Sequence, residues 1–502
     1  MPPTNVLFCA PTNSAVQTLG KDGITSRDTL QQLLQNPSLQ KSIKGGVIVL
    51  DEAGLVGSGN MHDLFALAVA HNARVILSGD TAQHKSVPRG DALRILEQYS
   101  DYKYLQIQTI RRQHEQFYRN AVREAARHDP QKALDILDHK DWVYESKTYQ
   151  QDAAEAYVEI LKAAQDAKAR SDSKHGTPQE KKPLVGEVAP AIMSAPTWGE
   201  IDAVTEKVRH CLSNNGILSG DDTLIDTFRS KGWTQAQKRC VANYSVGEQI
   251  SFQKPVSGFR TNELVTVVGT VDDPASPRKR LLLQVLRANR SKCLFDPRGG
   301  GGFDVGTVDK RPFCSGDMIL IQVNRKQKRP KQARRDKEKK QTSRDFINGE
   351  TAYIDKIVNG QIILTDGRTL PTDFRHFAHG YCLTSHTAQG KTAETAIVVA
   401  NGSSRMVNRE QFYVSISRGR SECRVFTNNK ADLRQRILKT SERKAGIELI
   451  QQLSIEQAQA ILKRRSQPLS KISPAALPTT PPLISLPQPP VPPEDLTASI
   501  DL

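Results

Sequence analysis

Three short apolar runs near the start of the chain constrain its fold more than any other feature. Residues 5–10, 46–50 and 74–78 are rich in Val, Ile and Leu, and each run ends in polar or turn residues. Such runs are typical of strands that are buried on both faces of a parallel sheet. Stretches of helical character separate them, and this alternation predicts a doubly wound α/β domain. Ligands of that fold bind at the carboxyl ends of the strands, so the residues after each run are the first candidates for a site.

The second run ends in two acidic residues, Asp51 and Glu52. An apolar strand that delivers Asp-Glu to its carboxyl end is the Walker B arrangement. In it the Asp holds Mg²⁺, directly or through water, and the Glu orients and deprotonates the attacking water. A strand followed by Asp-Glu also occurs by chance in α/β proteins, so an ordinary turn is the alternative.

The third run ends in Gly79 and Asp80, and Gln83 follows three residues after the Asp. A glutamine amide in this position can contact both the γ-phosphate of a nucleotide and the attacking water, and so report the state of the nucleotide. The alternative is a turn with a surface glutamine. Two strands that each deliver such groups favour the nucleotide site.

The segments DEAG and GDTAQHKSV resemble motifs II and III of superfamily-one helicases, in particular the RecD-like branch. Other segments resemble further motifs in the order of that family: APTNSA motif Ia, TLQQLL the threonine-containing segment after it, IRRQ motif IV, YCLTSHTAQGKT motif V and FYVSISRGR motif VI. Two stretches that begin at Ser194 and Trp233 are similar to the helicase portion of conjugative-transfer relaxases. The resemblance implies an ATP-dependent 5′→3′ DNA helicase or translocase that acts in plasmid transfer.

The resemblance also implies which residues form the site. Catalytic roles fall on Asp51, which would hold Mg²⁺, and on Glu52, Gln83, Arg112 and Arg418, the last at the arginine-finger position. Further nucleotide contacts fall on Gly79, Asp80, Arg111 and Gly390. Contacts with single-stranded DNA fall on Thr12, Thr29, Thr384, Ser385 and His386. ATP and Mg²⁺ are the implied cofactors.

One part of the family pattern, the phosphate-binding loop G-x-x-x-x-G-K-[ST], is not found in the sequence. AQGKT imitates its end, but Ser385 stands where the first Gly would fall, and an apolar strand-like run follows instead of a helix, so Lys391 is not the loop lysine. We therefore expect an N-terminally truncated motor without autonomous ATPase activity. The alternatives are a non-catalytic DNA-binding remnant and assembly with an upstream polypeptide that supplies the relaxase domain and the loop.

The sequence predicts two RecA-like α/β domains, the first incomplete, with a small β-rich insertion in the second. The expected boundaries are 1–165 for the first motor domain, 166–183 for a linker, 184–250 and 376–440 for the two parts of the second motor domain, 251–375 for an SH3-like insertion with a basic loop at 325–340, 441–466 for a helical segment, and 467–502 for a disordered proline-rich tail.

Composition agrees with a nucleic-acid partner. The net charge of +16 and the isoelectric point near 9.5 favour binding to a polyanion through phosphate contacts. The seven cysteines contain no C-x-x-C pair, which argues against a zinc knuckle and fits a reducing cytoplasm. No apolar run approaches the length of a membrane helix, so no membrane partner is expected. The histidines His376 and His379, near His386, are interpreted as structural and not as metal ligands.

Overall fold

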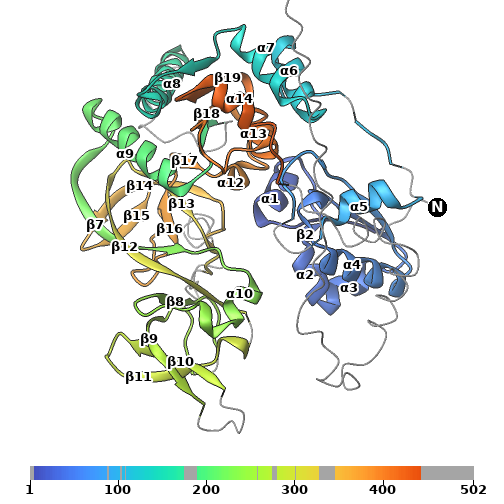
Figure 1. Cartoon of the computed structure of the whole chain (residues 1–502), viewed down its shortest axis with the longest axis vertical. Helices are drawn as coiled ribbons and strands as arrows, with labels where there is room; N and C mark the ends of the chain where they lie inside the picture. The colour runs from blue at the N-terminus through green and yellow to red at the C-terminus, as the bar shows by residue number, and fades with distance from the viewer. Residues whose placement is uncertain are drawn as a thin grey trace, which may run out of the picture. The chain divides into compact units, whose positions relative to one another are not determined.

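A computed structural model describes most of the chain (Figure 1). The described residues are 5–86, 90–101, 104–107, 109–174, 189–256, 258–273, 280–299, 301–326 and 345–441. Three predicted features lie mostly or wholly outside them: the basic loop, the helical segment from 441 and the proline-rich tail.

The three apolar runs form strands of one parallel sheet, as predicted. The sheet has four strands in the order β2-β1-β3-β4. The strands are β1 (Val6–Ala10), β2 (Arg27–Thr29), β3 (Val47–Leu50) and β4 (Arg74–Leu77). The helices that connect or follow them are α1 (Asn13–Lys21), α2 (Leu30–Gln35), α3 (Pro37–Ser42), α4 (Ser58–Ala70) and α5 (Ala92–Tyr99).

The outer strand β4 has an open edge. Among the described residues it pairs with β3 alone. Ile76, in the middle of β4, is 54% exposed, whereas Ile48 on the neighbouring β3 is fully buried. Proteins usually avoid an exposed strand edge with an apolar side chain and no charged residue at its centre, because a strand of another chain can pair with such an edge.

A second parallel sheet has five strands in the order β17-β6-β18-β19-β5. Its strands are β5 (Val143–Glu145), β6 (Ala189–Ser194), β17 (Cys382–Leu383), β18 (Ala393–Ala400) and β19 (Gly419–Thr427). The two sheets confirm the prediction of two RecA-like α/β domains.

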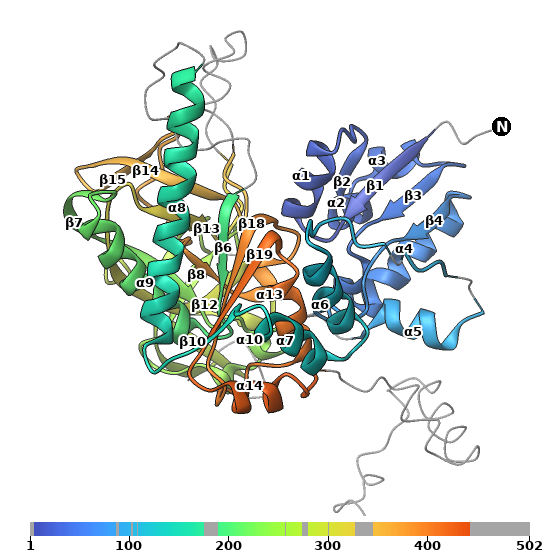
Figure 2. The same ribbon diagram turned by 90° about the horizontal axis from the view of Figure 1, so that it is seen from above.

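Helices cover both faces of the second sheet (Figure 2). One face packs against α8 (Tyr149–Lys174) and α9 (Trp198–Asn214). The other face packs against α6 (Gln116–Ala126), α7 (Pro130–Asp138), α13 (Arg409–Ile416) and α14 (Lys430–Arg436).

This packing moves two of the expected boundaries. The sequence assigned all of 1–165 to the first motor domain, but β5, α6, α7 and α8 belong to the core of the second sheet. The expected linker 166–183 is also wrong in its first half, because α8 continues to Lys174. The polar residues at the end of α8 stay helical because apolar side chains such as Tyr157 anchor its first half.

The β-rich insertion is larger than expected and has two cores. A six-stranded sheet has the order β11-β10-β9-β8-β12-β7 and a four-stranded sheet the order β15-β14-β13-β16. The strands are β7 (Ser219–Ser230), β8 (Gln249–Phe252), β9 (Leu264–Asp272), β10 (Leu281–Arg287), β11 (Lys292–Phe295), β12 (Phe303–Ser315), β13 (Met318–Ile321), β14 (Thr351–Val358), β15 (Gln361–Leu364) and β16 (Phe377–His379). Because β7 pairs with β12, the insertion starts before the expected residue 251.

Candidate nucleotide and DNA site

The carboxyl ends of β3 and β4 meet at one edge of the first sheet. Ser78 Oγ donates a hydrogen bond to Asp51 Oδ1 at 3.1 Å, so the two turns are in contact. A Cβ on Gly79 would lie 3.1 Å from the backbone nitrogen of Ala53 and 2.7 Å from Leu93 Cδ2. Close packing of the two turns therefore explains this glycine, and its predicted contact with a nucleotide stays a prediction.

Glu52 has an unusual backbone and an unusual environment. Its φ of 53° and ψ of 39° lie in the left-handed region, which residues with a side chain rarely adopt. Gln389 Nε2, from the second RecA-like domain, donates a hydrogen bond to Glu52 Oε2 at 3.0 Å. Burial raises the pKa of Glu52, and the hydrogen bond from Gln389 acts in the opposite direction.

Asp80 joins the two RecA-like domains. Its Oδ1 accepts the backbone N–H of Ala82 at 2.9 Å, which closes the turn after β4. Its Oδ2 accepts Gln83 Nε2 at 3.1 Å and the hydroxyl of Tyr413, on α13, at 2.6 Å. The amide oxygens of Gln83 and Gln389 are buried and have no hydrogen-bond partner among the described residues. They are two free acceptors in a site that also holds a carboxylate.

Arg112 and Arg418 bring two positive charges to the same site. Arg418 is 2% exposed and donates to Val414 O at 2.8 Å and to Ser417 Oγ at 2.6 Å. Arg112 Nη1 donates to Ser417 O at 2.9 Å. Burial and the neighbouring Arg112 lower the pKa of Arg418 to about 10. Within the described part of the chain neither arginine forms an ion pair with a carboxylate, which suits the binding of an anion such as phosphate.

The arrangement fits a nucleoside triphosphate with Mg²⁺. Asp51 has one oxygen bonded to Ser78 and is partly exposed, so a metal-bound water can reach it. The free amide oxygens supply hydrogen-bond acceptors, and the two arginines supply positive charge. Arg111, in contrast, is exposed, and Gly390 has a φ of 77°, which explains the glycine by its backbone. Their nucleotide contacts stay predictions.

The three threonines predicted to contact DNA all cap helices. Each Oγ1 accepts a hydrogen bond from a backbone N–H three residues further on: Thr12 from Ala15 at 3.2 Å, Thr29 from Gln32 at 3.1 Å and Thr384, before α12 (Ser385–Ala388), from Thr387 at 3.2 Å. Capping alone explains a threonine at these positions, so their contacts with DNA remain predictions.

Ser385 and His386 differ in their surroundings. Ser385 is buried, and its Oγ lies 2.9 Å from Nε2 of His84, which belongs to the turn after β4. His386 is exposed, and its ring stacks on the ring of His84. The turn after β4 and the start of α12 are therefore in direct contact.

Three residues of this site were not identified from the sequence: His84, Gln389 and Tyr413. Each lies inside or next to a motif in which we predicted a different residue to form the site. Gln389 stands within AQGKT, two positions before Lys391, and Tyr413 lies five positions before Arg418 in the same motif. The signal was present, but which residue of a motif faces the other domain depends on tertiary structure.

Two other groups of potential ligands have hydrogen-bond partners within the protein. His376 Nε2 lies 2.8 Å from Ser251 Oγ and His379 Nε2 lies 3.0 Å from Pro312 O, both inside the insertion. The potential ligand atoms of Asp222, Cys314 and Asp317 lie close enough together to hold a metal ion. The positive charge beside them is the guanidinium group of Arg209. Arg209 Nε and Nη2 each donate to Asp317 at 3.0 Å.

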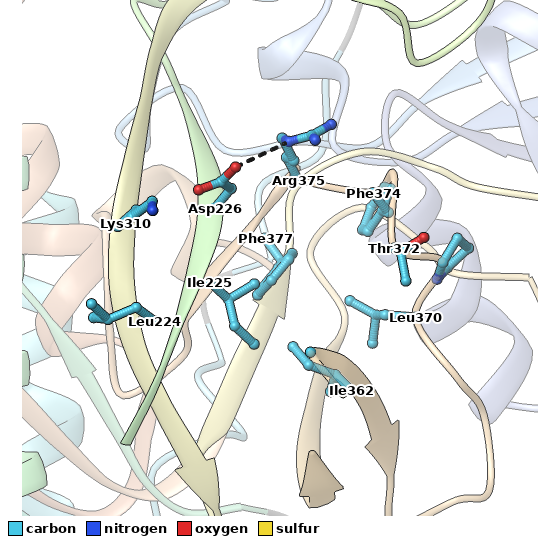
Figure 3. Close-up of a pocket in the computed structure, with 12 residues that line it drawn as sticks. Leu224, Ile225, Asp226, Lys310, Ile362, Leu370, Thr372, Phe374, Arg375 and Phe377 are labelled. Carbon is cyan, nitrogen blue, oxygen red and sulfur yellow. Dashed lines mark ion pairs between the residues drawn. The ribbon is translucent and has the colours of Figure 1, made fainter. Parts of the chain in front are cut away.

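A pocket lies in the insertion, between β7, β12, β15 and the segment 370–377 (Figure 3). Its walls combine apolar side chains, Leu224 and Ile362 among them, with polar ones, and an ion pair joins Asp226 to Arg375 over 3.9 Å. None of the residues predicted to bind nucleotide or DNA lines this pocket. Separately, no helix in the described ranges combines the length and apolar character that crossing a membrane requires.

Comparison with known proteins agrees with this description. The model of the AAA domain family matches residues 3–148, and the model of the viral superfamily 1 RNA helicase core domain matches residues 319–427. The multifunctional conjugation protein TraI of Escherichia coli is 24% identical over 465 residues, which are 85% of this chain and 24% of TraI. The conjugal transfer protein TraA of Agrobacterium fabrum is 35% identical over 92 residues, which are 18% of this chain and 8% of TraA.

Among solved structures, the Pif1 helicase from Bacteroides in complex with ADP-AlF3 and single-stranded DNA has 12% sequence identity and a TM-score of 0.34. The match covers 88% of this chain and 86% of that chain. A likeness this distant supports no argument about the site.

The two parallel sheets define a protein with two RecA-like α/β domains. In its two family-model matches and in its matches to TraI and TraA, the chain is similar to superfamily-one helicases of the conjugative-relaxase type. It spans 24% of the length of TraI.

Proposed function

We propose that the chain is the motor portion of a conjugative relaxase, which couples ATP hydrolysis to 5′→3′ movement along single-stranded DNA. One observation carries the proposal. Glu52 from the first motor domain, and Arg112 and Arg418 around the second sheet, converge on one site, and neither arginine is paired with a carboxylate among the described residues. The polarity and the role in plasmid transfer rest on the family resemblance.

The residues of the site have distinct roles in this proposal. Glu52 takes the proton of the attacking water, and the free amide oxygens of Gln83 and Gln389 accept hydrogen bonds from that water. Arg112 and Arg418 offset the charge that develops on the transferred phosphoryl group. Mg²⁺, held by Asp51, would neutralise charge on the phosphate oxygens.

The open edge of β4 offers a place for the phosphate-binding loop, which is not in this sequence. A further strand parallel to β4 would cover Ile76 and end beside Asp51 and Asp80. A glycine-rich turn after that strand would then face the two arginines. We propose that a strand from outside the printed sequence pairs here and supplies the loop.

Coupling between ATP and DNA would use the contacts between the two motor domains. Gln389 bonds Glu52, Tyr413 bonds Asp80, and Ser385 bonds His84. Each contact joins a segment of the nucleotide site on the first domain to motif V or VI on the second. A nucleotide that displaces Gln389 or Tyr413 would therefore shift the segment that carries the predicted DNA contacts.

The test is ATP hydrolysis, with and without single-stranded DNA, by the complete natural polypeptide that contains these residues. Glu52→Gln keeps the shape of the side chain and removes the base, so we expect hydrolysis to fall about 10²- to 10⁴-fold while DNA affinity is retained. Glu206→Gln, an exposed carboxylate on α9, is the matched control and should hydrolyse ATP normally. Absence of DNA-stimulated hydrolysis in the unmodified protein would instead support the non-catalytic DNA-binding remnant.

A further inference from the structure

His84 and His386 form a stack of two rings between the motor domains. The ring centroids are 3.6 Å apart and the ring planes differ by 10°. His84 belongs to the turn after β4, and His386 belongs to α12 on the second motor domain. Parallel rings at this distance are in van der Waals contact over their faces.

The inner ring of this stack is held in place. His84 is 5% exposed, and its Nε2 is 2.9 Å from the buried Ser385 Oγ, so its orientation is fixed by a hydrogen bond as well as by packing. Burial lowers the pKa of His84 to about 3, so the ring is neutral at any working pH. It is a flat, uncharged support.

The outer ring remains accessible. His84 covers one face of His386, and His386 is nevertheless an exposed residue, so part of it remains accessible to solvent. A flat aromatic ring that is backed by a second, buried ring can accept a third ring on its open face without rearranging. Bases of single-stranded nucleic acids bind such rings regardless of their identity, because every base has a π face.

We propose that His386, backed by His84, is a platform on which one base of single-stranded DNA stacks. The proposal rests on the proposed function, since it specifies how the motor holds its strand. It assigns to His386 a contact with a base and not with the backbone, and it gives His84 a positioning role.

The platform is also adjacent to the nucleotide site. His84 directly follows Gln83, whose amide donates to Asp80 and whose oxygen is a free acceptor. A base on His386 would thus be separated from the backbone of this turn by the stacked rings of His386 and His84. Movement of the turn when nucleotide binds would be passed to the base by ring contact.

The test measures binding of a fluorescein-labelled oligothymidylate, and of the same oligonucleotide with one 2-aminopurine, to the complete protein without nucleotide. His386→Ala should weaken binding about tenfold, which corresponds to the loss of one stacked base. His386→Phe keeps a flat ring and should bind within about twofold of the unmodified protein. His62→Ala changes an exposed histidine on α4 and should have no effect.

The fluorescence of 2-aminopurine adds a direct readout, because stacking quenches it. We expect quenching with the unmodified protein and with His386→Phe, and none with His386→Ala. His84→Leu removes the backing ring and should weaken binding about threefold, whereas His84→Phe should restore it.

Unchanged affinity and unchanged quenching in His386→Ala would overturn the platform and leave the stack as packing between domains. That outcome would not affect the proposed function, because the unmodified protein would still bind DNA. Failure of the unmodified protein to bind the oligothymidylate would overturn both.

Discussion

At the scale of single residues, the site depends on polar contacts between side chains that are far apart in the sequence. Motif spacing predicted Asp51, Glu52, Gln83 and Arg418 as site residues, because each follows a strand or lies in a recognisable segment. Spacing could not identify Gln389 or Tyr413, because their role comes from the way the two domains face each other.

The hydroxyl of Tyr413 should stabilise the contact between the domains. Tyr413→Phe removes a hydrogen bond to the Asp80 carboxylate and should lower the free energy of unfolding by about 1.5–3 kcal/mol, the range for a bond to a charged group. Urea unfolding measures the loss, and Tyr104→Phe, on an exposed tyrosine, is the control. If Tyr413→Phe has the same effect in an Asp80→Ala background, which has no side-chain acceptor, the two residues are not coupled.

The buried histidines of the insertion predict a stability that depends on pH. Burial lowers the pKa of both His376 and His379 to about 4, below the value of about 6.5 in an unfolded chain. Protons therefore bind the unfolded state more tightly, so the stability present above about pH 6.5 is lost as the pH falls towards 4.

Each histidine contributes a slope of up to about 1.4 kcal/mol per pH unit in that window. Urea unfolding between pH 7 and 5 measures the slope. His376→Gln should make it shallower, whereas His62→Gln, on an exposed histidine, should not. An equal slope in all three proteins would show that His376 does not titrate on unfolding.

At the scale of secondary-structure elements, strands were easier to predict than boundaries. The runs 5–10, 46–50 and 74–78 became β1, β3 and β4 because continuous apolar sequence is what a buried parallel strand requires. The polar strand β7 was missed because much of its length is exposed. The sequence could not place α6 and α7, because an amphipathic helix does not specify the sheet on which it packs.

The edge of β4 gives a prediction for hydrogen exchange. The amides of Arg74 and Ser78 donate to carbonyls at the ends of β3, so by alternation the amides of Val75 and Leu77 point to the open edge. In the printed chain alone, Val75 and Leu77 should exchange much faster than Ile76. If a further strand pairs with β4 in the complete protein, both amides should become protected there. Fast exchange in both would contradict the pairing.

At the scale of the whole molecule, the positive net charge favours binding to a polyanion. The net charge of +16 predicts an affinity for single-stranded DNA that falls with salt, with a slope of about −0.7 for each phosphate neutralised. The two-domain architecture and the basic character were both predictable, because one follows from repeated strand patterns and the other from composition.

The basic loop at 325–340 gives a prediction at this scale. Replacing residues 327–340 with a Gly-Ser segment of equal length should weaken DNA binding and make the salt slope shallower, because fewer counterions are released. Fluorescence anisotropy at several salt concentrations measures both quantities. An unchanged slope would show that this run is not a DNA contact.

We propose that both RecA-like domains contribute to one hydrolysis site. Hydrolysis of ATP that is stimulated by single-stranded DNA tests this proposal most directly. In the complete polypeptide, Glu52→Gln and Arg418→Lys should each lower kcat by about 10²- to 10⁴-fold. The double variant should be little worse than either, because residues that act together are not additive. Normal hydrolysis by Arg418→Lys, or losses that multiply in the double variant, would contradict a shared site.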